Sequence, residues 1–122
     1  MINIKWAQSP EKKHFKAAIS YLSLIFTPKK ARKLVNEMKD IHCVEFKSKD
    51  IFRASGLSLL GISNSHVAEF QTKIRAGIPL IPILLVRDPV LGKVHVADGY
   101  HRLCAVYSFH EDAIIPCRIV TA

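Results

Sequence analysis

Apolar residues recur along the first forty positions at the spacing of an α-helix. One helix face is spaced by four, three and four residues: Phe15, Ile19, Leu22 and Phe26. Ser9 and Pro10 precede this face as an N-cap and a first helical residue. Thr27 and Pro28 repeat that signal before a second apolar face, formed by Ala31, Leu34, Val35 and Met38. The pattern predicts an N-terminal helical hairpin within residues 1–40, after a short strand or extended arm over residues 2–6.

Strand patterns appear in the remainder of the chain. Alternation predicts a strand over residues 41–46, and the apolar run over residues 83–86 predicts a strand buried on both faces. A turn over residues 88–93 would connect this strand to a second, antiparallel strand over residues 94–97, so that the two form a hairpin. A final strand is expected over residues 114–120.

Helix signals lie between these strands. Ser48 is expected to cap a short helix that Gly56 ends. Asn64 or Ser65 is expected to cap another, which ends near Gly77. A last helix is expected from Asp98, with Leu103, Val106 and Phe109 on its apolar side.

Helices interleaved with few strands predict an α+β (mixed α/β) fold, in which flanking helices cover a small mixed sheet. A length of 122 residues, 49% of them apolar, fits one domain, with a helical extension at 1–40 and a core at 41–122. The sequence holds neither an apolar run long enough to span a membrane nor a secretory signal, so we expect a cytoplasmic protein with no membrane partner. Three widely spaced cysteines predict buried, reduced thiols rather than disulfides or a zinc site.

Positive charge is concentrated in the first part of the chain. Residues 1–53 hold twelve Lys and Arg against five Asp and Glu, which gives +7, whereas residues 54–122 hold six against five, which gives +1. Such a block favours an anionic partner or is simply a solvated basic surface. The candidates for nucleic-acid binding crowd the start of the second helix: Lys29, Lys30, Arg32 and Lys33.

Chemistry-bearing residues are densest at the predicted strand–helix turn that begins at Asp98. Asp98 has the N-cap position, and Gly99 allows a sharp turn and close approach of a ligand. The first N–H groups of a helix attract anions, and His101 and Arg102 add side-chain donors. A phosphate or carboxylate ligand is therefore expected. The structural alternatives are that Asp98 only caps the helix, that Arg102 only pairs with Asp98 or Glu69, and that His101 is structural.

Two other chemistries fit this stretch less well. His95, Asp98 and His101 are metal-ligand types, but His95 precedes the turn on a strand, so we assign no metal site. Cys104 follows His101 by three residues, which places it toward the core rather than beside a base.

Residues 44–120 resemble the ParB/sulfiredoxin-like superfamily. The resemblance rests on the order of parts: a helix ending at Gly77, the strand Pro82-Ile83-Leu84-Leu85-Val86, a hairpin, the segment Ala97-Asp98-Gly99-Tyr100-His101-Arg102, and a closing strand over residues 115–120. ParB has Gly-Glu-Arg-Arg at this turn, and sulfiredoxins have Gly-Gly-Cys-His-Arg. Gly99 and Arg102 match both, and His101 matches the second. Tyr100 stands where sulfiredoxins have the reactive Cys and ParB has Glu, which argues against either family's reaction.

The resemblance implies binding of nucleotide phosphates, from CTP, ATP or ADP together with Mg²⁺, by Gly99, Tyr100, His101 and Arg102. It also implies that the same cleft is lined by His66, Lys47, Lys49 and Arg53. Asp98 and His101 are then the candidate catalytic residues for phosphotransfer or hydrolysis. The alternatives are a nucleic-acid-binding module or ParB-like nuclease, and a non-catalytic interaction protein. Because the sequence ends at Ala122, we expect no helix-turn-helix domain of the ParB kind after this fold.

Overall fold

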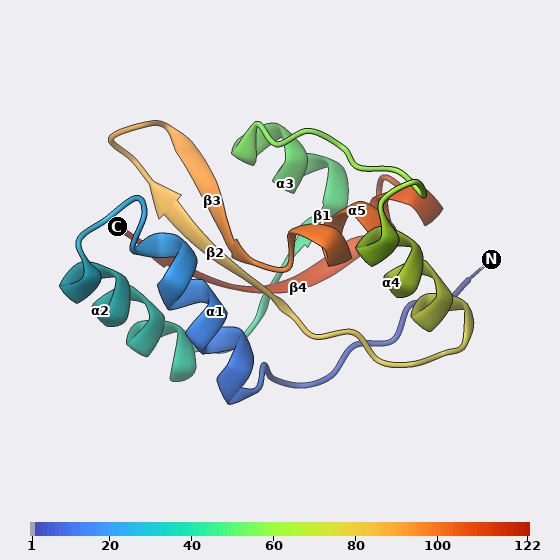
Figure 1. Ribbon diagram of the computed structural model, residues 1–122, viewed down its shortest axis with the longest axis horizontal. Helices are drawn as coiled ribbons and strands as arrows, with labels where there is room; N and C mark the ends of the chain where they lie inside the picture. Colours follow the sequence, from blue (N-terminus) through green and yellow to red (C-terminus); the bar gives the residue numbers. More distant parts are fainter. Residues whose placement is uncertain (1) are drawn as a thin grey trace.

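The computed structural model describes residues 2–122, and within them five helices surround a four-stranded mixed sheet (Figure 1). This confirms the predicted α+β class. The helices are α1 (Lys12–Leu22), α2 (Pro28–Lys39), α3 (Ser48–Ser55), α4 (Ser65–Arg75) and α5 (Tyr100–Phe109). The strands are β1 (Val44–Lys47), β2 (Ile83–Asp88), β3 (Lys93–Asp98) and β4 (Ile114–Thr121).

The sheet has the strand order β1-β4-β2-β3. β2 forms the predicted antiparallel hairpin with β3 and pairs in parallel with β4 on its other side. β1 pairs antiparallel with β4 and closes the opposite edge. As expected, all four residues of the apolar run over residues 83–86 are buried, because β2 is central and both of its faces are covered.

Helices cover both faces of the sheet and form two cores. On one face α1 and α2 pack side by side against Leu84, Val86, Ala97 and Val120 (Figure 1). On the other face α3, α4 and α5 pack against Ile83, Leu85, Val96 and Cys117. The predicted helical hairpin is confirmed, and the residues that it buries include Leu22, Val35 and Met38. Full burial of a side chain of this size contributes about 1.5–3 kcal/mol.

The start and end of α1 differ from the prediction. The helix begins at Lys12 rather than Pro10, because the backbone N–H of Glu11 donates to His14 Nδ1 at 3.0 Å and this reciprocal cap fixes the first turn. Its last residue is Leu22, so Phe26 lies in the loop before α2. Residues 2–6 form no regular strand, and Trp6 makes one isolated bridge with Leu80.

Three local expectations in the rest of the chain need correction. β1 covers Val44–Lys47 rather than residues 41–46. Ser48 is the first residue of α3 rather than its cap, and its hydroxyl donates to the Glu111 carbonyl at 2.6 Å. Cys43 is half-buried, although Cys104 and Cys117 are buried as predicted. The caps at Thr27 and Asn64 and the end of α3 at Gly56 are confirmed.

Within residues 2–122, no helix combines the length and the apolar character that a membrane crossing needs.

Candidate functional site

The turn between β3 and α5 is held in its sharp form by Gly99. Asp98 is the last residue of β3 and Gly99 occupies the N-cap position, so the expectation that Asp98 caps the helix was wrong. Gly99 has φ +109°, and a Cβ there would lie 2.9 Å from both Arg102 Nη2 and Ile83 Cγ1. Leu103 N–H donates to the Gly99 carbonyl, so Tyr100, His101 and Arg102 supply the free N–H groups that begin the helix.

The guanidinium of Arg102 lies directly beneath this turn. Arg102 is only 6% exposed, and its Nη2 lies 2.9 Å from Asp98 Oδ2 and 3.5 Å from the Pro82 carbonyl. Its Nε has no hydrogen-bond partner within residues 2–122. The predicted pairing of Arg102 with Asp98 is therefore present, whereas Glu69 pairs with Lys73 instead. Asp98 orients the guanidinium but leaves part of its donor capacity unused.

Arg102 forms one wall of a small hollow of about 180 Å³. The start of α1 contributes Lys13 and His14, and α4 contributes Phe70 and Lys73. The residues lining the rest are Glu11 and the chain over residues 78–81. Burial, followed by the charge of Arg102, lowers the pKa of His14. The hollow therefore gathers several nitrogen donors around one buried guanidinium.

Two of these donors are already in weak ion pairs at the surface. Lys13 lies 3.7 Å from Glu11, and Lys73 lies 3.6 Å from Glu69. Exposed pairs of this kind contribute little to stability. An anion that entered the hollow can therefore recruit both lysines at low cost. Sequence reasoning missed Lys13, His14, Phe70 and Lys73, because only the tertiary fold brings the start of α1 and part of α4 to the same hollow.

His66 and His101 form a pair of rings beside the turn. Their centroids are 4.9 Å apart, with the Tyr100 ring 5.5 Å from that of His101. Burial, and to a lesser degree the neighbouring His66, holds the pKa of His101 below its ordinary value. His101 is thus neutral at pH 7 and can accept a proton. The structure places His66 beside the turn, as the resemblance implied.

The hydroxyl of Tyr100 is engaged by a backbone carbonyl. It donates to the Ser58 carbonyl, which ties the loop between α3 and α4 to the start of α5. Burial raises the pKa of Tyr100, so the phenol stays protonated at neutral pH. Through this contact the hydroxyl has a structural part in the turn.

Lys47, Lys49 and Arg53 do not lie in this cleft, contrary to expectation. Lys47 and Lys49 lie 3.8 and 2.7 Å from Asp112, and Arg53 lies 3.5 Å from Asp50. Asp112 follows the C-terminal end of α5, and a helix rises about 1.5 Å per residue, so roughly 15 Å of helix separates these lysines from the turn. The reason is that the first turn of α3 packs on the carbonyls that follow α5.

His95 lies on the other face of the sheet and does not approach His101. Its Nε2 lies 2.9 Å from Asp88 Oδ2 in a buried pair, and its ring meets the edge of Phe26. Hence His95, Asp98 and His101 do not converge. In the part of the chain that the structure describes, no three His, Cys, Asp or Glu side chains are grouped for a metal ion. Burial raises the pKa of Cys104, which disfavours a reactive thiolate.

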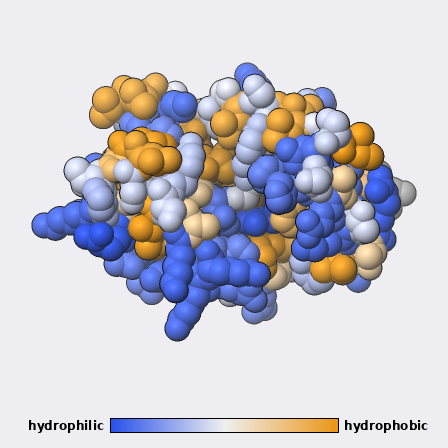
Figure 2. All heavy atoms as spheres, in the orientation of Figure 1, coloured by the Kyte–Doolittle hydropathy of each residue, from blue (hydrophilic) through white to orange (hydrophobic). Residues whose placement is uncertain are grey.

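The basic residues proposed for nucleic acid lie on a separate surface. Lys29, Lys30, Arg32 and Lys33 are exposed along the first turns of α2. Figure 2 shows hydrophilic side chains projecting over this end of the molecule. Lys30 also lies 5.5 Å from the Phe26 ring centroid. The four cations are thus accessible and independent of the turn.

No family model matches the chain, and no curated protein or solved structure gives a match.

Proposed function

We propose that the chain binds a nucleotide or another phosphate ligand at the Asp98–Arg102 turn. The observation that supports this most is the buried guanidinium of Arg102, incompletely hydrogen-bonded and lining a hollow that Lys13 and Lys73 also border. The three free N–H groups at the start of α5 belong to the same turn as Arg102. The resemblance to the ParB/sulfiredoxin-like superfamily points to the same ligand class. We also propose that the protein acts in the cytoplasm, where nucleotides are present.

The phosphate would be held by convergent weak contacts. Backbone N–H groups at a helix start and a planar guanidinium both match phosphate oxygens. Lys13 and Lys73 would neutralise further charge, and Phe70, whose ring centroid lies 6.0 Å from Arg102 Cζ, offers an apolar surface beside them. The volume of about 180 Å³ suits the phosphate part of a nucleotide rather than the whole molecule.

A Mg²⁺ ion that accompanies the nucleotide would find one carboxylate here. Mg²⁺ on nucleotides takes one or two carboxylates in addition to phosphate oxygens and water. Asp98 Oδ2 is engaged by Arg102, so Oδ1 is the oxygen that fits this requirement. When bound, the ion would neutralise charge on the phosphates.

Phosphotransfer or hydrolysis would use His101 as the proton acceptor. Its lowered pKa keeps the ring neutral at pH 7, and it is the second residue of α5. Asp98, the other candidate, is held by Arg102 and serves to position the guanidinium. Release of inorganic phosphate from ATP or CTP, compared between the wild type and His101→Gln, tests turnover. Binding without any release would make the protein a non-catalytic phosphate binder.

Calorimetric titration with ATP, ADP and CTP in the presence of Mg²⁺ tests binding itself. We expect saturable heat for at least one nucleotide, and about tenfold weaker binding after Lys73→Ala, because one charge-assisted contact is lost. Lys93→Ala, an exposed lysine in β3, is the matched control and should leave the affinity unchanged. Absence of heat with all three nucleotides at millimolar concentration would reject the proposal.

A second candidate function, nucleic-acid binding, is favoured by the four exposed cations of α2. Replacing Lys29, Lys30, Arg32 and Lys33 by Ala should abolish retention of DNA, and the affinity of the wild type should fall steeply with salt. The same assay with Arg102→Lys separates this surface from the turn. Unchanged retention after the fourfold replacement would eliminate this function.

A further inference from the structure

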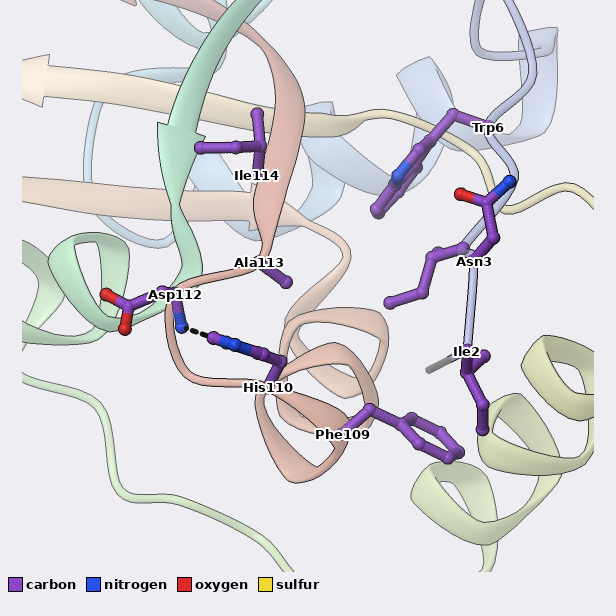
Figure 3. Close-up of a pocket in the computed structure, with 9 residues that line it drawn as sticks. Ile2, Asn3, Trp6, Phe109, His110, Asp112, Ala113 and Ile114 are labelled. Carbon is purple, nitrogen blue, oxygen red and sulfur yellow. Dashed lines mark hydrogen bonds between the residues drawn. The ribbon is translucent and has the colours of Figure 1, made fainter.

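A cavity of about 410 Å³ lies beside the C-terminal end of α5, remote from the turn (Figure 3). The N-terminal arm forms one wall, and the corner between α5 and β4 forms the other. The lining residues of the arm are Ile2, Asn3, Ile4 and Trp6. Those of the corner are Phe109, His110, Asp112, Ala113 and Ile114. The volume falls in the range of about 300–1,000 Å³ that is usual for small-molecule sites.

The apolar lining of this cavity includes two aromatic rings, those of Trp6 and Phe109. Trp6 is held because Ala7 N–H donates to the Leu80 carbonyl and Leu80 N–H donates to the Lys5 carbonyl, each at 2.8 Å. Arg75 Cζ lies 5.2 Å from the centroid of the Phe109 ring. Two aromatic rings in the lining favour a flat ligand that can lie against them.

One polar group of the cavity, His110, offers a hydrogen-bond donor. His110 Nδ1 accepts from the Asp112 backbone N–H at 2.9 Å, so the neutral ring carries its proton on Nε2. Backbone acceptors at this corner are already used. Ser48 N–H donates to the Ala113 carbonyl, and Lys49 N–H and Ser48 Oγ both donate to Glu111. The unused capacity therefore suits a ligand that accepts hydrogen bonds.

The charged groups around the cavity are largely paired with one another. Asp112 is the acidic residue in its lining, and two lysines, Lys47 and Lys49, lie within 3.8 Å of its carboxylate. In Figure 3 that carboxylate points away from the cavity. Arg75 adds a further positive charge behind Phe109. Glu111 and Asp50 also lie near Lys49, so the charges at this corner nearly balance and the ligand class rests on the hydrogen-bond donor of His110.

We propose that this cavity binds a flat aromatic acid, with its ring against Trp6 and Phe109 and its carboxylate at His110 Nε2. The site is independent of the phosphate ligand proposed for the turn. Trp6 is the single tryptophan of the chain, so its indole N–H gives one reporter signal inside the cavity.

The test is an NMR titration of this indole signal with 2-naphthoate, and with 2-naphthylmethylammonium as a probe of the same ring but opposite charge. We expect a saturable shift with the acid and at least about tenfold weaker binding of the cation. Ala113→Phe, which fills the cavity, should abolish the shift. Ala54→Phe fills a separate hollow beside Ile51 and Leu85 and should leave it intact.

A second variant keeps the test decisive if Ala113→Phe does not fold. His110→Asp retains an acceptor for the Asp112 N–H but removes the donor and adds a negative charge. It should weaken naphthoate by at least about tenfold, the loss expected for a charge-assisted hydrogen bond. The proposal is overturned if naphthoate causes no indole shift at millimolar concentration, if both probes bind equally, or if His110→Asp binds naphthoate as the wild type does.

Discussion

At the scale of single residues, the turn depends on a glycine that no other residue can replace without strain. At Gly99, a side chain would meet both the guanidinium of Arg102 and Ile83, and φ is +109°. Gly99→Ala should therefore lower the free energy of unfolding by about 2–4 kcal/mol, measured by urea denaturation. Gly92→Ala is the control, because φ there is also positive, at +66°, but the space is open, so a loss of about 1 kcal/mol is expected. Equal losses would show that Gly99 has no packing role.

The pair of Asp98 and Arg102 leads to a second prediction at this scale. Asp98→Asn leaves a buried guanidinium without its counter-charge and should cost about 3 kcal/mol of unfolding free energy. Glu69→Gln, which breaks the exposed pair with Lys73, should cost less than about 1 kcal/mol. Because a bound anion can replace the lost carboxylate, millimolar phosphate should restore more stability to Asp98→Asn than to the wild type. Thermal melts with phosphate, with chloride as the control, measure this difference.

At the scale of elements, the buried pair of Asp88 and His95 connects the two strands of the β2–β3 hairpin. The hydrogen bond from His95 lowers the pKa of Asp88, and Leu91 N–H donates to the same carboxylate. A carboxyl group whose pKa is lower in the folded than in the unfolded protein stabilises the fold at pH values above its unfolded pKa, near 3.8. This stabilisation is lost as the pH falls through the folded pKa. Asp88→Asn should therefore be less stable than the wild type at pH 6, with a difference that narrows below about pH 4. A difference in urea midpoint that stays constant from pH 6 to pH 3 would contradict this role.

The sequence predicted helices and strands best where a single pattern of capping or apolar residues was strong and no other pattern competed with it. α2 has an N-cap followed by proline and four regularly spaced apolar residues, and β2 has an uninterrupted apolar run; both were confirmed. α1 begins later than Ser9-Pro10 indicated, because the contact between Glu11 and His14 forms the cap. Placement of side chains from distant segments was harder to predict. His66 lies beside the turn, but Lys47 and Lys49 follow α3 to the far end of α5, which no local pattern encodes.

At the scale of the whole molecule, the helical hairpin is part of the fold rather than an appendage. It packs on one face of the sheet, where it buries Leu84, Val86 and Val120, and it supplies Lys13 and His14 to the hollow. A fragment of residues 41–122 would expose that face and should show no cooperative unfolding transition. Circular dichroism during thermal melting checks this. A fragment with a cooperative melt like that of the full chain would show that the core folds without the hairpin.

The proposed function requires that a phosphate ligand binds at the start of α5. The most direct measurement is an amide NMR titration of the full chain with ATP and Mg²⁺, with assignments for Tyr100, His101 and Arg102. We expect these three amide signals to shift most and to saturate together, while those of Lys29 and Lys30 on α2 stay in place. Saturable shifts confined to α2, or no shift at these three amides at millimolar ATP, would contradict it.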